Sequence, residues 1–117
     1  MNQKQLQELF DYDYKNGGLI WKINLNIIKK KHNGKRFGFI ETKGYIKGNI
    51  EKRTYREHRL VWIWHNGDIA KNMEIDHINR NKSDNRIENL RLATHKQNMQ
   101  NRKDNWKKYY TKNGFSF

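Results

Sequence analysis

The sequence predicts an α+β fold made of small antiparallel hairpins and a few helices. Only 34% of its 117 residues are hydrophobic, so the chain has material for a thin core. Turn-forming residues separate the apolar runs at short intervals, which favours short strands. Two other segments, residues 3–10 and 57–66, place apolar residues at helical spacing. Because the chain has no proline, repeat or low-complexity linker, we expect one continuous unit.

The first half of the chain predicts one helix followed by short strands. Leu6, Leu9 and Phe10 share a helical face, and a turn at residues 16–18 leads into a strand over residues 19–22. Residues 24–36 are polar and basic, and predict a solvated loop. Further strands are expected over residues 37–41, 45–50 and 54–56, with turns at residues 43–44 and 52–53.

The second half predicts a buried helix and then a strand, long loop, strand and helix. The segment EHRLVWIWHNG forms the first helix, closed by Gly67. Its Trp62 and Trp64 are better explained as core residues than as a base-stacking platform, because apolar residues are scarce. Strands over residues 73–78 and 89–93 flank a loop at 79–85. Thr94 and Gln97 form a capping box, which predicts a helix from residue 95 toward residue 106.

The charge of the chain indicates a polyanionic partner. Lys and Arg total 25 against 12 Asp and Glu, which gives a net charge of +13. Residues 1–20 contain two bases and three acids, whereas the rest contains 23 bases and nine acids. A nucleic-acid surface is therefore expected beyond the first segment.

Several classes of protein are disfavoured by composition. The absence of cysteine excludes disulfides and thiolate zinc clusters. No apolar run approaches the ~18 residues of a membrane span, so no membrane partner is expected. Residues 1–10 lack the apolar segment of a signal peptide, and an intracellular location is expected.

Four polar residues stand on three consecutive predicted elements: Asp76, His77, Asn89 and Asn98. Adjacent residues of a regular strand point to opposite faces. Asp76 and His77 can serve one phosphate only if the strand ends or distorts there, and the loop beginning at Asn79 provides the reason. Asn98 falls in the first turn of the capped helix, from which its side chain can point back across the hairpin.

These residues carry a family resemblance. The motifs are D-H-I-N at residues 76–79, D-N-R-x-x-N-L-R at residues 84–91 and T-x-x-x-N at residues 94–98. Together with HRLVWIWHNG upstream, they resemble the HNH endonucleases of the ββα-metal nuclease superfamily. The similarity is greatest to the phage and intron-homing type, in which asparagine replaces the last histidine. It is dense over residues 54–101, and ELFDYDYKNGGLIWK is similar to the N-terminal piece of phage-encoded relatives.

The resemblance implies a metal-dependent DNA endonuclease. His77 would be the general base, and Asn89 would hold the loop and the His77 ring. Asp76 and Asn98 would bind one divalent ion, and their oxygen ligands favour Mg²⁺ or Mn²⁺ over Zn²⁺. The expected substrate is double-stranded DNA and the expected products are 5′-phosphate and 3′-hydroxyl ends. A monomer has one such site and should nick; whether the protein is a monomer or a homodimer stays open, as do its target sequence and its role in homing, packaging or attack on host DNA.

The same resemblance divides the chain into three parts. Residues 54–106 form the nuclease core, residues 1–53 form a DNA-contacting or packing extension, and residues 107–117 form a basic aromatic tail. Individual phosphate contacts cannot be assigned from a charge run, but the core and its border offer seven candidates. These are Arg53, Arg56, Arg59, Arg86, Arg91, Arg102 and Lys103. Other candidates are Lys29, Lys30, Lys31, Lys35, Arg36, Lys107 and Lys108.

Alternatives remain at each residue. His95 competes with Asn98 as the helix ligand, although the motif spacing prefers Asn98. Glu74 alternates with Asp76 and could join the metal, although it is expected to support the ligands or to be exposed instead. A zinc site from His58, His65 and His77 has no recognisable ligand spacing. For the whole chain, the main rival is a non-catalytic DNA-binding module with a vestigial site; an RNA-binding protein is a third possibility, without a recognisable signature.

Overall fold

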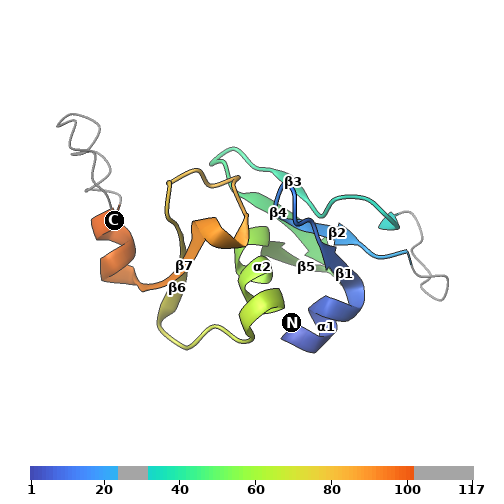
Figure 1. Ribbon diagram of the computed structural model, residues 1–117, viewed down its shortest axis with the longest axis horizontal. Coiled ribbons are helices and arrows are strands. Elements are labelled where there is room, and N and C mark those ends of the chain that lie inside the picture. The colour runs from blue at the N-terminus through green and yellow to red at the C-terminus, as the bar shows by residue number, and fades with distance from the viewer. Residues whose placement is uncertain (24–31, 102–117) are drawn as a thin grey trace.

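Three small antiparallel sheets surround one central helix in the computed structural model, which describes residues 1–23 and 32–101 (Figure 1). The predicted α+β class is confirmed. In chain order, the elements are α1 (Gln3–Leu9), β1 (Phe10–Tyr12), β2 (Leu19–Trp21), β3 (Phe39–Ile40), β4 (Ile46–Ile50), β5 (Arg53–Arg56), α2 (Glu57–Asn66), β6 (Met73–His77), the 3₁₀ helix η2 (Ile87–Asn89) and β7 (Leu90–Thr94). Residues 95–101 are helical. The sheets pair β1 with β2, β3 with β4 and β5, and β6 with β7.

Helix α2 supplies the centre of the core. It contacts α1, β4, β5, β6 and η2, and Figure 1 shows it between the β6–β7 hairpin and the other sheets. Leu60 and Val61 are fully or almost fully buried. Trp62 and Trp64 are partly buried and pack against the core, as predicted. The helix ends where expected, because Gly67 adopts φ 87° and its N–H donates to Ile63 O at 2.9 Å.

The N-terminal segment packs directly against α2. A capping box between Asn2 and Gln5 starts α1. The helix was predicted to include Phe10, but Phe10 begins β1 instead, because its carbonyl accepts a hydrogen bond from Trp64 Nε1 (3.0 Å) while its backbone pairs with Trp21. Gln7 Nε2 also donates to Trp64 O at 2.8 Å. The start of the extension is therefore part of the folded core.

The middle sheet differs from the prediction at two places. Strand β3 starts at Phe39 rather than at Phe37, because Phe37 is buried and its N–H donates to Leu19 O (2.9 Å) in the core. The turn between β4 and β5 falls at Glu51 and Lys52, one residue earlier than predicted, and both have positive φ. Such φ values are typical of the tight turns that join two antiparallel strands.

The last four elements follow the predicted order of strand, loop, strand and helix. Asp76 pairs with Arg91 and His77 with Leu90 in the β6–β7 register. The addition is η2, which turns the chain into β7. The predicted capping box is confirmed: Gln97 N–H donates to Thr94 Oγ1 at 3.1 Å and Thr94 N–H to Gln97 Oε1 at 2.8 Å.

Some expectations lie outside the described residues. These concern Lys29, Lys30, Lys31, Arg102, Lys103, Lys107, Lys108 and the tail at residues 107–117. Within the described ranges, none of the helices has the length and apolar character needed to cross a membrane.

Candidate active site at the end of β6

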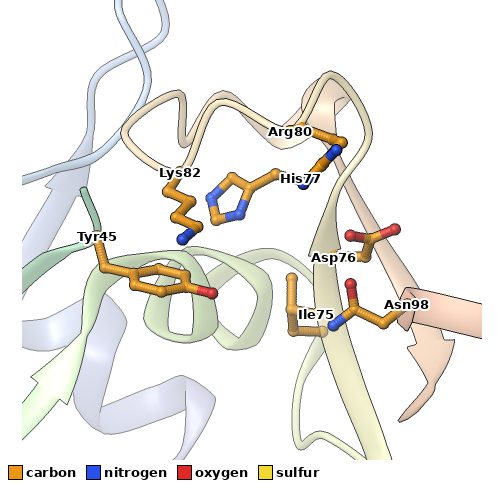
Figure 2. A pocket seen from close by; sticks show the side chains of 7 residues that line it. All are labelled: Tyr45, Ile75, Asp76, His77, Arg80, Lys82 and Asn98. Carbon is orange, nitrogen blue, oxygen red and sulfur yellow. The ribbon is translucent and has the colours of Figure 1, made fainter. Parts of the chain in front are cut away.

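Three of the sequence-predicted residues line one pocket. Asp76 and His77 come from the end of β6, and Asn98 comes from the helix that follows β7 (Figure 2). The free volume is about 30 Å³, which is room for one or two water-sized groups. Among the described residues, the pocket is lined by Tyr45, Ile75, Asp76, His77, Arg80, Lys82 and Asn98.

The His77 ring is held through Nε2 by Asn85, and the ring also lines the pocket. Strand β6 ends at this residue, as predicted, so the ring and the Asp76 carboxylate reach the same pocket. His77 is 5% exposed, and its Nε2 lies 2.7 Å from Asn85 Oδ1. Burial lowers the pKa of His77, while the Asn85 hydrogen bond and the charge of Asp76 act in the opposite direction. A lowered pKa keeps the imidazole neutral and able to accept a proton.

Asp76 is buried and has two donors on one oxygen. Its side chain is 5% exposed, and Oδ2 accepts from Arg91 Nε at 3.0 Å and from Asn101 Nδ2 at 2.9 Å. Asn101 is itself 3% exposed and also approaches His77 O at 3.3 Å. Sequence reasoning missed Asn101, although it lies one helical turn after Asn98 and so on the same face. Arg91, expected on DNA, is engaged by the site carboxylate.

Asn98 is oriented by Glu74 rather than by Asp76. Its Nδ2 donates to Glu74 Oε1 at 2.7 Å, and the other Glu74 oxygen lies 2.7 Å from His95 Nδ1. With its nitrogen committed, the carbonyl oxygen of Asn98 is directed toward Asp76 in Figure 2. The Asp76 carboxylate and the Asn98 carbonyl offer oxygen as the donor atom, so the donor set fits a hard divalent cation such as Mg²⁺. His95 faces Glu74 and does not line this pocket.

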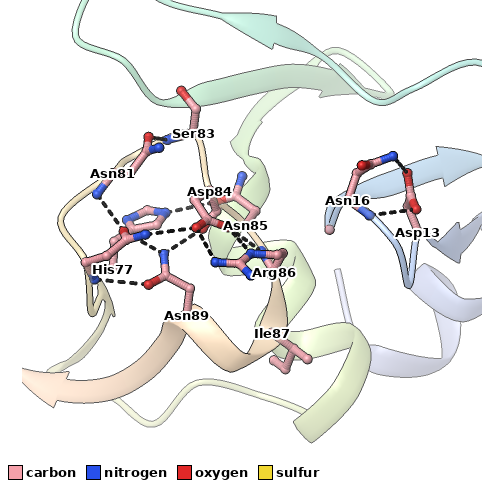
Figure 3. A network of polar contacts seen from close by, with 12 residues as sticks. Asp13, Asn16, His77, Asn81, Ser83, Asp84, Asn85, Arg86, Ile87 and Asn89 are labelled. Atoms are coloured by element: carbon pink, nitrogen blue, oxygen red, sulfur yellow. Dashed lines mark hydrogen bonds and ion pairs between the residues drawn. The ribbon is translucent and has the colours of Figure 1, made fainter.

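Asn89 fastens the loop between β6 and η2 (Figure 3). Its Oδ1 accepts from Asn79 N–H at 3.0 Å, and its Nδ2 donates to Asn79 Oδ1 and to Asp84 O, each at 2.9 Å. The expectation that Asn89 holds the loop matches these bonds. The expected contact with the His77 ring is made by Asn85 instead, because η2 turns the Asn89 side chain back into the loop.

Ion pairs within the protein engage two of the predicted DNA-binding residues, whereas two others are exposed. Arg86 binds both carboxylate oxygens of Asp84, each at 2.8 Å, and lowers the pKa of that carboxyl to about 2. Arg56 pairs with Glu41 at 3.1 Å. Arg53 and Arg59 are exposed.

The pocket also has positive residues that the sequence did not single out. Lys82 and Arg80 line it, and Lys82 Nζ lies 4.9 Å from the centroid of the Tyr45 ring. The guanidinium of Arg56 lies over the same ring at 4.0 Å. In the sequence, Arg80 and Lys82 are distinguished only by their position in a polar loop. This signal is too weak to select them from 25 basic residues.

His58 lies directly beside His77, with ring centroids 4.8 Å apart. It stacks on Tyr45 and is 7% exposed; burial first, and the His77 charge second, lower its pKa to about 3. It is therefore a neutral packing partner. The alternative zinc site is not supported: His65 contacts Val61 O and Tyr12 instead, and among the described residues no three His, Cys, Asp or Glu side chains are placed to hold a metal ion.

Comparison with known proteins agrees with the motifs. The model of a family described as HNH endonuclease matches residues 55–100. YosQ of Bacillus subtilis (strain 168), an SPbeta prophage-derived protein whose name marks it as an inferred HNH homing endonuclease, is 38% identical over 77 residues. The match covers 62% of this chain and 44% of that relative, so the chain corresponds to less than half of the relative's length. No solved structure matches the chain significantly.

Proposed function

We propose that the chain, whose residues 55–100 match the model of the HNH endonuclease family, is a divalent-metal-dependent endonuclease that hydrolyses phosphodiester bonds of double-stranded DNA. The observation that carries the proposal is the meeting of Asp76, His77 and Asn98 at one pocket, from two separate elements. A carboxylate, an imidazole and an amide oxygen at one small pocket are the groups that metal-assisted hydrolysis requires.

The ion would be held by the Asp76 carboxylate and the Asn98 carbonyl oxygen, with Mg²⁺ or Mn²⁺ as the preferred ions. When bound, it supplies positive charge for the pentavalent transition state and the 3′ leaving oxygen. Two protein ligands leave most coordination positions to water and DNA, so binding of the ion without DNA is expected to be weak.

His77 would take the proton of the attacking water. Its neutral ring at the pocket suits this task, because a general base has to be unprotonated at the working pH. Lys82 and Arg80, at the rim of the pocket, would draw the scissile phosphate in, and the net charge of +13 would steer the duplex toward the site. The products would be a 5′-phosphate and a 3′-hydroxyl.

One site per chain cuts one strand per encounter, so a monomer would nick DNA. The name of the prophage-derived relative favours homing over packaging or attack on host DNA, and favours a reaction inside a bacterial cell. In this proposal residues 54–106 form the nuclease core, residues 1–53 its extension and residues 107–117 a basic tail.

A supercoiled-plasmid assay with Mg²⁺, Mn²⁺ and Zn²⁺ in parallel tests the proposal. The expected result is relaxed circles with Mg²⁺ or Mn²⁺, abolished by His77→Ala while binding of a duplex persists. His32→Ala is the matched control, because His32 stacks on Trp21 and does not line the pocket. Absence of cutting with each of the three ions, despite tight duplex binding, would falsify the assignment.

That outcome is what the second candidate predicts, a DNA-binding module with a vestigial site. One observation favours it: Asp76 is already engaged by Arg91 and Asn101, which compete with an ion for the same carboxylate. Replacing DNA by a structured RNA in the same gels distinguishes the nuclease and the DNA-binding module from a protein that acts on RNA.

A further inference from the structure

A line of hydrogen bonds connects the N-terminal hairpin turn to the ring of His77. Leu19 N–H donates to Glu57 Oε2 at 3.0 Å. The other oxygen of this carboxylate, Oε1, accepts from Asn85 Nδ2 at 2.9 Å. Asn85 Oδ1 then lies 2.7 Å from His77 Nε2. Glu57 is 0% exposed and Asn85 is 2% exposed, so the line is shielded from water.

The direction of each hydrogen bond in this line is fixed. The NH₂ group of Asn85 donates to Glu57, so the Asn85 carbonyl is turned toward His77. A carbonyl oxygen only accepts, so the proton of the neutral imidazole must be on Nε2. The lone pair of the ring is then on Nδ1, which forms no hydrogen bond to any of the described residues and belongs to a side chain that lines the pocket.

We propose that Glu57 and Asn85 are positioning residues that hold His77 as its Nε2–H tautomer, so that Nδ1 is the atom that receives the proton of the attacking water. This inference rests on the proposed role of His77 as the base. The N–H of Leu19 is part of the device, because it occupies the second oxygen of Glu57 and so directs the first toward Asn85.

A tie between the N-terminal turn and α2 alone would not need Asn85. The Leu19 bond uses one carboxylate oxygen, and an exposed polar residue could hold the turn equally well. Burying both oxygens of a carboxylate costs free energy. Burial raises the pKa of Glu57, while the hydrogen bonds from Asn85 and Leu19 lower it. The second oxygen is directed at the amide that contacts the His77 ring.

The turn is shaped around this carboxylate. Gly18 has φ 88°, and a Cβ on it would lie 2.5 Å from Arg36 Nη2 and 2.9 Å from Glu57 Oε1. Only glycine therefore lets the turn approach Glu57 closely enough for Leu19 to bond it. The extension before residue 55, which the family match does not include, would then be required to position the base.

Glu57→Gln is the decisive variant, because it keeps the shape and changes the direction of the line. The amide introduced by this substitution would accept from Leu19 N–H with its carbonyl and offer its NH₂ to Asn85, so Asn85 would flip and donate to His77 Nε2. The ring proton would move to Nδ1 and block the base. We expect the ¹⁵N spectrum of His77, recorded where the ring is neutral, to report Nε2–H in the unchanged protein and Nδ1–H in the variant.

The cleavage rate at saturating DNA should fall with the tautomer, by about 10²-fold and up to the ~10⁴-fold that general base catalysis contributes. Duplex binding should be unchanged. If Glu57 acts through Asn85, Glu57→Gln should add almost nothing to the loss caused by Asn85→Ala in the double variant. Gly18→Ala should reduce the rate in the same direction. Glu88→Gln, on the exposed face of η2, is the matched control and should change neither readout.

An Nδ1–H ring in the unchanged protein overturns the inference, and this result does not require any variant to fold. A Glu57→Gln protein with the Nε2–H ring and an unchanged rate overturns it too. The tautomer is measured without metal or DNA, so the two proposals can fail separately. If Glu57→Gln switches the tautomer but the protein never cuts DNA, the positioning role of Glu57 is supported and the proposed nuclease function is contradicted. If the protein cuts DNA but the tautomer does not depend on Glu57, the nuclease function is supported and the positioning role is contradicted.

Discussion

The two sides of the pocket are built differently. The side that holds the proposed base, called the base side, consists of His77, Asn85, Glu57, His58 and Asn89. Each of these residues is at most 7% exposed. The side that holds the proposed metal ligands, called the metal side, consists of Asp76, Arg91, Asn101, Glu74, His95 and Asn98. Its Asp76 and Asn101 are equally buried, but the Arg91 and Glu74 side chains are 38% and 37% exposed and that of His95 is 75% exposed. In the proposed mechanism, the base is thus fixed before substrate arrives, whereas an ion has to replace the contacts that Arg91 and Asn101 make with Asp76.

This difference separates two kinds of cost. Fixing the base in advance avoids reorganisation during the reaction, which is where preorganised groups are most effective. A metal side closed by an ion pair keeps the buried Asp76 carboxylate compensated while no ion is bound. Substitutions on either side of the pocket test this difference.

Asp76→Asn should have the largest effect on cleavage. It removes the charged ligand of the metal side but keeps the shape, so the rate should fall by about 10³-fold, the equivalent of several kcal/mol of transition-state stabilisation. Asn98→Ala removes a neutral ligand, and its smaller loss should be partly restored by raising the Mg²⁺ concentration. Rates against Mg²⁺ concentration check both. Equal losses that ignore Mg²⁺ would show that Asn98 is not a ligand.

Asn89→Ala should have the largest effect on stability. It removes three hydrogen bonds of a side chain that is 5% exposed, so the free energy of unfolding should fall by about 2–3 kcal/mol. Asn98→Ala is the control from the metal side, where a half-buried amide with one bond to a half-exposed Glu74 should cost below about 1 kcal/mol. Urea unfolding measures both. A larger loss at Asn98 would reverse the comparison.

His58 makes the base side sensitive to acid. The pKa of His58 is about 3 in the folded protein, below its ordinary value, so the unfolded chain binds more protons between these two values. Stability from this residue is complete above the ordinary value and is lost as the pH falls below it. The free energy of unfolding should be about 2 kcal/mol lower at pH 5 than at pH 7.

His58→Phe keeps an aromatic ring against Tyr45 and removes Nδ1, which is buried without a hydrogen-bond partner among the described residues. Urea unfolding at both pH values should therefore show a flatter dependence in this variant. An unchanged slope would place the acid sensitivity elsewhere in the protein.

Arg91→Met should have the smallest effect and the opposite sign. Without the guanidinium, the Asp76 carboxylate is available to an ion, so Mn²⁺ should bind about tenfold more tightly in the absence of DNA. Calorimetric titration measures this affinity, with Arg86→Met as the control because Arg86 pairs with Asp84 instead. Weaker Mn²⁺ binding would mean that Arg91 orients the ligand rather than competing with the ion.

The base side also shows where sequence reasoning stops. The order of strand, loop, strand and helix could be predicted, because it depends on local patterns such as the Thr94–Gln97 capping box and Gly67. The partner of the His77 ring could not be predicted, since Asn85 and Asn89 are both amides of this loop. Only the path of η2 determines which of the two reaches the ring.

Long-range contacts were equally hidden. Glu57 is 28 residues from Asn85, and its proposed positioning role depends on the docking of the N-terminal turn. The end of α1 was misplaced for the same reason, because the Trp64 indole that donates to the Phe10 carbonyl is 54 residues away. Spacing within a motif carries information over a few residues, whereas these contacts depend on how separate elements pack.

The most direct test is the effect of Mn²⁺ on the NMR signals of the protein without DNA, since Mn²⁺ broadens resonances close to it. The account predicts broadening of the side-chain amide signals of Asn98, loss of that broadening in Asp76→Asn, and an Nε2–H ring at His77 in the spectrum recorded before Mn²⁺ is added. Sharp Asn98 signals at Mn²⁺ concentrations that support DNA cleavage would contradict it.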